Sequence, residues 1–91
     1  MAPITWAQSA DRHAVPHEDA VHAIVHAVYF VPKFDDNRTG SIAPDLYIGP
    51  DRQGQLIEVM LERRSKTVAN VFHVMLVRPK ILNEAKRRIG K

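Results

Sequence analysis

Two apolar runs dominate the second half of the chain, at residues 56–61 and 68–77, and a polar segment at 62–67 separates them. Both runs are rich in the β-branched and aromatic residues that favour strands. Their apolar side chains would point to both faces of an extended chain, as is typical of strands that are covered on both sides. The pattern predicts a β-hairpin at the centre of a sheet, and the stretch from Gly54 to Lys80 organises the rest of the fold.

Helical spacing of apolar residues occurs at two other places. Residues 16–28 open with Pro16 and two acidic residues, which suit a first helical turn, and then repeat valine and isoleucine at intervals of three and four. Residues 79–89 also open with a proline, and basic side chains flank their apolar face. We predict helices over both ranges and one or two further helical turns from Ser9.

Short extended segments complete the expected fold. Pro32 prevents the first helix from continuing, and residues 29–31 are expected to form a short strand. Residues 35–44 are rich in Asp, Asn, Gly, Ser and Pro, which predicts an exposed loop before a strand at 45–49. The prediction is a single α+β domain over residues 1–91, with a three- or four-stranded antiparallel sheet, N-terminal helices packed on one face and a basic C-terminal helix.

Composition narrows the possible functions. A chain of 91 residues is long enough for one domain with one core, and it contains no cysteine. Disulfides, thiolate nucleophiles and cysteine-based metal sites are therefore excluded. No apolar run is long enough to span a bilayer, and the first residues lack the pattern of a signal peptide. We expect a cytoplasmic protein with no membrane partner.

Charge is distributed unevenly along the chain. Residues 1–60 carry four Lys/Arg and eight Asp/Glu, whereas residues 61–91 carry nine Lys/Arg and two Glu. A basic final third suits a polyanion such as nucleic acid. The candidate nucleic-acid-binding residues are Arg63, Arg64, Lys66, Lys86, Arg87 and Arg88. The alternative is that these side chains form an ordinary solvated surface.

Two histidines have the spacing of metal ligands. His22 and His26 lie four residues apart in the predicted helix, with Glu18 four residues before His22. They flank the apolar stripe, where amphipathic side chains are commonly half-buried, and no further cluster completes a site. We therefore interpret them as flanking residues and expect no metal and no other cofactor.

His73 has the most plausible chemistry in the chain. It lies in the second apolar run, shortly before Arg78 and Lys80, and Glu58 or Glu62 is the expected orienting or proton-transferring carboxylate. Metal-free cleavage of RNA needs a base near the 2′-hydroxyl, cations on the phosphorane and an acid for the leaving oxygen, and these residue types supply them. The alternative is a core histidine that a backbone carbonyl satisfies.

The order of several short motifs resembles that of the BrnT-like toxins of bacterial type II toxin–antitoxin systems, within the wider RelE/ParE group. The matching segments read W at residue 6, RHAVPHEDA at 12–20, YIG at 47–49, GQLIEV at 54–59, VFHVM at 71–75 and RPK at 78–80. The chain departs from the family pattern in two places. Many members have Ser-Ala-Arg where this chain has His73-Val74-Met75, and the aromatic residue often found in the last helix is absent.

The resemblance implies a RelE/ParE-like fold and a toxin that cleaves mRNA, on the ribosome or free, and so inhibits growth. It also implies a ribbon-helix-helix antitoxin as partner, and operator DNA bound through the toxin–antitoxin complex. If the missing arginine contributes to cleavage in the family, either Arg78 or His73 replaces it here or the activity is weak or absent. Two other functions stay open: a non-catalytic module that binds nucleic acid or an acidic partner, and a structural interaction protein.

Overall fold

The computed structural model describes residues 4–34 and 43–89, so most of the predicted loop at 35–44 lies outside the described residues. The elements, in chain order, are β1 (Ile4–Trp6), the 3-10 helix η1 (Gln8–Asp11), α1 (His17–Val25), β2 (Tyr29–Val31), β3 (Asp45–Pro50), β4 (Leu56–Arg63), β5 (Ala69–Leu76) and α2 (Pro79–Ile89). The α+β class is confirmed. The C-terminal helix has the predicted bounds, and the central hairpin is present.

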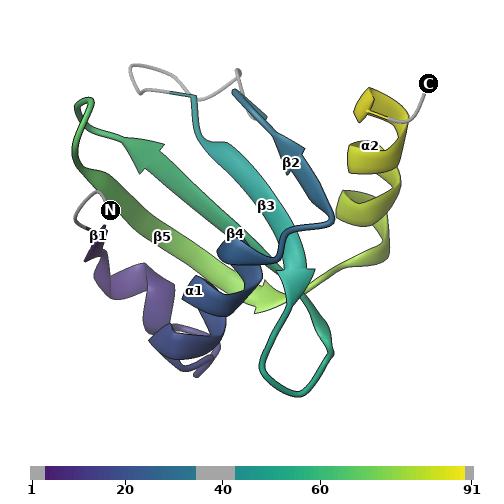
Figure 1. Cartoon of the computed structure of the whole chain (residues 1–91), viewed down its shortest axis with the longest axis horizontal. Coiled ribbons are helices and arrows are strands. Elements are labelled where there is room, and N and C mark those ends of the chain that lie inside the picture. The colour runs from purple at the N-terminus through teal and green to yellow at the C-terminus, as the bar shows by residue number, and fades with distance from the viewer. Residues whose placement is uncertain (1–3, 35–42, 90–91) are drawn as a thin grey trace.

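The strands form one mixed sheet in the order β1-β5-β4-β3-β2 (Figure 1). The pairs β2–β3, β3–β4 and β4–β5 are antiparallel, and β3, β4 and β5 form the predicted meander. β1, in contrast, pairs with β5 in parallel. The sheet therefore differs from the three- or four-stranded antiparallel sheet that was predicted. A run of three residues is too short to show a strand period, and the partner of β1 lies at the other end of the chain.

The first core cluster lies between the sheet and the N-terminal helices, which Figure 1 shows in front of the lower strands. It consists of apolar residues of β4 and β5 and three alanines of η1 and α1: Ala10, Ala20, Ala23, Ile57, Val59, Leu61, Ala69, Val71 and Val74. Small side chains let α1 approach the sheet closely. At Gly49 in β3, a β-carbon would collide with the carbonyl oxygen of Ala23, so only glycine fits there.

Helix α1 ends three residues before the predicted residue 28. His26 leaves helical geometry with φ −108° and ψ 27°, and the backbone N–H of Val28 donates to the carbonyl of Ile48. Valine and isoleucine continue the helical spacing as far as residue 28, but from Val28 onwards the backbone forms hydrogen bonds with β3 instead of continuing the helix. Within the described ranges, no helix has both the length and the apolarity that crossing a membrane requires.

Helix α2 packs on the opposite face of the sheet, beside β2 (Figure 1). Its cluster contains five buried residues, Val31, Phe34, Leu46, Ile48 and Ala85, together with half-buried side chains that include Leu56 and Met60 of β4. The cluster includes no described residue of β5. This apolar cluster therefore does not cover the face of β5 that carries His73.

A bulge interrupts the pairing of β4 with β5. Met60 pairs with His73, but the next residue, Leu61, pairs with Val71, so Phe72 is an extra residue in β5. A bulge reverses which face the following side chains take, and this one lets both Val71 and Val74 enter the first cluster. His73 consequently lies on the face of Met60, which it shares with Glu58.

Candidate active site

Glu58 is the centre of a buried ionic cluster. Its side chain is 0% exposed. One carboxylate oxygen, Oε1, lies 2.7 Å from His73 Nε2 and 2.7 Å from Arg78 Nη2. The other, Oε2, accepts from the backbone N–H of Arg78 at 2.9 Å and from its Nε at 3.3 Å. Three of the five predicted catalytic residues therefore meet around one carboxylate.

The surroundings of Glu58 keep it ionised. Burial alone would raise the pKa of a carboxyl group, but hydrogen bonds from His73 and from the Arg78 side chain and backbone outweigh burial. Together they lower the pKa of Glu58 from 4.5 to about 2. At neutral pH the cluster thus contains a permanent anion next to a permanent cation.

An ionised carboxylate determines which nitrogen of His73 carries a proton. Glu58 has no proton to donate, so His73 Nε2 must donate in the 2.7 Å contact. Among the described residues, Nδ1 of the same ring has no hydrogen-bond partner. His73 in its neutral form therefore offers a lone pair at Nδ1, and Glu58 stabilises the positive charge that appears when Nδ1 takes a proton.

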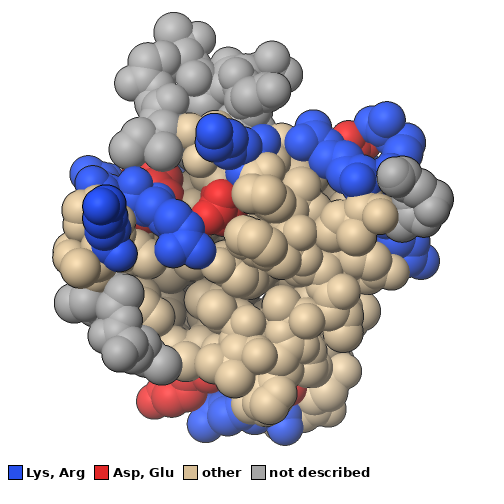
Figure 2. Space-filling model, turned by 45° about the horizontal axis from the view of Figure 1, so that its top comes forward, with Lys and Arg blue, Asp and Glu red and all other residues tan. Residues whose placement is uncertain are grey.

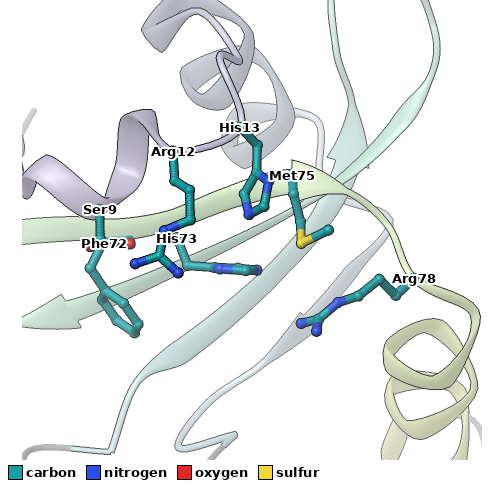
Figure 3. Close-up of a pocket in the computed structure, with 7 residues that line it drawn as sticks. All are labelled: Ser9, Arg12, His13, Phe72, His73, Met75 and Arg78. Carbon is teal, nitrogen blue, oxygen red and sulfur yellow. Dashed lines mark hydrogen bonds between the residues drawn. The ribbon is translucent and has the colours of Figure 1, made fainter.

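A pocket of about 390 Å³ adjoins this cluster. It lies along β5 beyond the end of β1, which pairs only with residues 69–71. The residues that line it are Ser9, Arg12, His13, Phe72, His73, Met75 and Arg78. Figure 3 shows Arg12 and His13 reaching towards His73 from the N-terminal segment, and Arg78 on the other side. His73 is 22% exposed and is satisfied by a carboxylate, so it is not the core histidine bound to a carbonyl that was the alternative.

His13 and Arg12 are functional candidates that the sequence reasoning did not select. The rings of His13 and His73 meet edge to face with centroids 6.1 Å apart. Among the described residues, Arg12 forms no ion pair, so its charge is available to a ligand. The feature of the sequence that could have pointed to them is the basic pair Arg12-His13 at the start of the segment 12–20, which resembles a BrnT-like motif. Its proximity to His73 depends on the parallel pairing of β1 with β5, which the sequence pattern did not show.

The other two predicted catalytic residues lie outside the pocket. Lys80 is exposed in the first turn of α2, and Glu62 lies four residues farther along β4 than Glu58. Glu62 pairs with Arg64 at 3.3 Å. Neither side chain lines the pocket, so the structure brings together Glu58, His73 and Arg78 but not Glu62 or Lys80.

The predicted nucleic-acid-binding residues do not form a single surface. Arg63 lies on the α1 face of the sheet, where it donates to Asp45 at 2.8 Å and to the Tyr47 hydroxyl at 3.1 Å. Arg64 and Lys66 are exposed in the hairpin turn. On α2, Arg87 and Arg88 share the carboxylate of Glu84, and Lys86 is exposed beside them. Figure 2 shows basic side chains in separate groups around an uncharged area.

His22 has a structural contact. Its Nδ1 lies 2.9 Å from the carbonyl oxygen of Pro50, which can only accept, and its ring lies 4.4 Å from the ring of His26. Over residues 4–34 and 43–89, no three side chains of the metal-ligating types gather into a site. The two histidines are placed as flanking residues of α1, and the absence of a metal stays a prediction.

No family model matches the chain, and comparisons with curated proteins and with solved structures also gave no match. The resemblance to BrnT-like toxins therefore stays a prediction from short motifs.

Proposed function

We propose that this chain is the toxin of a type II toxin–antitoxin system, with a RelE/ParE-like fold, and that it cleaves RNA in the cytoplasm without a metal. One observation carries the proposal: two histidines and two arginines converge on one pocket, and a buried carboxylate orients one of the histidines. Metal-free phosphodiester cleavage needs these groups, namely two proton-transfer groups and fixed cations for the developing negative charge.

Within this proposal, each pocket residue has a distinct role. His73 Nδ1 removes the proton from the 2′-hydroxyl, and the 2′-oxygen attacks phosphorus. His13 in its protonated form donates to the departing 5′-oxygen, so the products are a 2′,3′-cyclic phosphate and a free 5′-hydroxyl. Arg12 and Arg78 bind the phosphate oxygens. Ser9 has no role as a nucleophile because its hydroxyl donates to the carbonyl of Phe72 at 2.7 Å.

Binding of RNA should depend on salt, and Arg12 should contribute more to this dependence than Arg87. Each phosphate contact to a single strand contributes about 0.7 to the slope of log affinity against log salt. We expect Arg12→Gln to reduce that slope by about 0.7. Arg87→Gln or Arg88→Gln should reduce it less, because Glu84 already neutralises part of their charge. Affinities over a salt series, with Arg52→Gln as control, measure this, and an unchanged slope in Arg12→Gln would remove Arg12 from the RNA surface.

Non-catalytic binding of a protein partner is the second candidate function, and an apolar groove on the α1 face favours it. The groove measures about 150 Å³ and is lined by Ile4, Val21, Ile24, Val25, Tyr47, Leu61, Arg63 and Ala69. Val25 in this lining is exposed, and the exposed Phe30 packs against Tyr47 of the lining with ring centroids 4.8 Å apart. Arg63 at the rim suits an apolar segment that carries acidic residues. Within the toxin proposal, the partner for this groove is the ribbon-helix-helix antitoxin, which also carries the complex to operator DNA.

Expression of the chain alone should stop bacterial growth, and co-expression of the antitoxin encoded beside it should restore growth. Inducible plasmids and growth curves measure this, with protein level confirmed by immunoblot. Val25→Asp should stay toxic when the antitoxin is present, because a carboxylate in the groove repels an acidic partner segment. Normal growth at full soluble expression of the unchanged chain would contradict the toxin proposal and favour the binding module.

A further inference from the structure

The segment between η1 and α1 carries both Arg12 and His13, and its two ends are joined by a side-chain contact. Asp11 Oδ1 lies 2.7 Å from His17 Nε2. Backbone bonds support the near end, where the N–H of Ala14 donates to the carbonyl of Asp11 at 3.1 Å. The contact closes the segment into a short ring that contains the two pocket residues.

The ring is also attached to the sheet. The His17 imidazole stacks on Trp6 with ring centroids 3.8 Å apart and an angle of 5° between the planes. Trp6 belongs to β1 and pairs with Val71, two residues before His73. Asp11, His17 and Trp6 thus connect the segment that carries His13 to the strand that carries His73. We call this set of three residues the clasp.

Backbone strain lies at the same place. Ala14, which follows His13, has φ 59°, in the left-handed region that a residue with a β-carbon seldom adopts. Such a conformation persists only where the surrounding contacts impose it, and it is concentrated at functional sites. The contacts at hand are the clasp on one side and the turn from Asp11 on the other. Without these contacts, Ala14 is expected to return to a negative φ, and the segment would change its conformation.

We propose that the clasp is a positioning device that holds His13 and Arg12 over the pocket for the cleavage reaction; this inference rests on the proposed function. Asp11, His17 and Trp6 do not line the pocket, so they act through His13 and Arg12 and touch no substrate. The side chains of Asp11 and His17 are 60% and 41% exposed, and exposed ion pairs contribute little to folding stability. The clasp should therefore matter for geometry far more than for folding.

Asp11→Ala is expected to lower the single-turnover cleavage rate by about 10- to 100-fold, because a misplacement of about 1 Å costs that much in an oriented reaction. The melting temperature should stay within about 3 °C of the wild type. Asp11→Asn keeps a side-chain oxygen that can accept from His17 Nε2–H, so it should recover most of the rate. Arg52→Gln is the matched control, since it breaks another exposed ion pair, Arg52–Asp19, away from the pocket.

Trp6 provides a readout that does not depend on cleavage, because it is the only tryptophan in the chain. Its fluorescence should change in Asp11→Ala and His17→Gln, as the stacked imidazole moves, and not in Arg52→Gln. In NMR spectra, contacts between the ring protons of His13 and His73 should weaken in the same two variants. Wild-type cleavage in Asp11→Ala, or unchanged ring contacts, would overturn the inference. If the unchanged protein does not cleave RNA, the proposed function fails, and the NMR contacts still decide whether the clasp positions His13.

Discussion

Replacing His73 with glutamine is expected to lower the rate of RNA cleavage by about 100- to 10,000-fold, which is the usual contribution of a general acid or base. Glutamine can keep a side-chain N–H for Glu58, but it has no nitrogen that can take a proton as His73 Nδ1 does. The fold should persist, because the side chain is similar in length and the buried carboxylate keeps a donor. Single-turnover cleavage of a short RNA, measured beside a thermal melt, checks both statements.

His13→Gln is the matched variant for this experiment. It should lose a comparable factor, because its removal leaves the departing oxygen without an acid. The double variant should lose much less than the product of the two factors if the two histidines act in one proton-transfer sequence. All reactions are run with and without EDTA, and equal rates are expected. Unchanged cleavage in His73→Gln, or a loss explained by unfolding, would end the catalytic assignment of His73.

Local patterns predicted most of the fold. Apolar periods, prolines and turn residues indicated both helices, the strands β2 and β3 and the central hairpin, because each of these elements has its signal within its own residues. β1 lacked such a signal. Its three residues become a strand only through pairing with β5, so the parallel edge of the sheet was not predictable from the pattern.

The residues of the candidate site also fall into those that local sequence could select and those that depend on long-range pairing. Glu58, His73 and Arg78 lie on the hairpin or directly after it, and antiparallel pairing brings Glu58 opposite Met75, close to His73. Residue type and strand position were enough to select them. Arg12 and His13 reach the pocket only through the long-range pairing of β1. The bulge at Phe72 was equally hidden, although it decides which face His73 occupies.

For the basic residues, the sequence-based prediction lacked a different kind of information. Sequence shows that a side chain is charged but not whether a carboxylate neutralises it. Arg63 donates to Asp45, Arg64 pairs with Glu62, and Arg87 and Arg88 share Glu84, so four of the six predicted binding residues are paired within the protein. Arg12 is unpaired within the described residues and lies in the pocket. The positive charge that matters for a ligand therefore lies partly outside the basic C-terminal third.

Glu58→Gln should destabilise the protein by about 3 kcal/mol and remove part of its acid sensitivity. The amide leaves Arg78 without a counter-charge in a site where the carboxylate was 0% exposed. In the wild type, hydrogen bonds from His73 and Arg78 overcome burial and depress the pKa of Glu58 from 4.5 to about 2.

The sign of the pH effect follows from this lowered pKa. The folded protein holds the Glu58 proton more weakly than the unfolded chain does, so the contribution of Glu58 to stability is complete above the unfolded value of 4.5. It is lost as the pH falls from about 5 towards 2, and the loss amounts to about 3 kcal/mol. Urea unfolding over this pH range should therefore show a shallower decline in Glu58→Gln than in the wild type. Glu84→Gln, which removes a carboxylate from an exposed ion pair, should retain nearly the wild-type decline. If Glu58→Gln and the wild type lose stability in parallel as the pH falls, Glu58 is not the buried anion that holds His73 and Arg78 together.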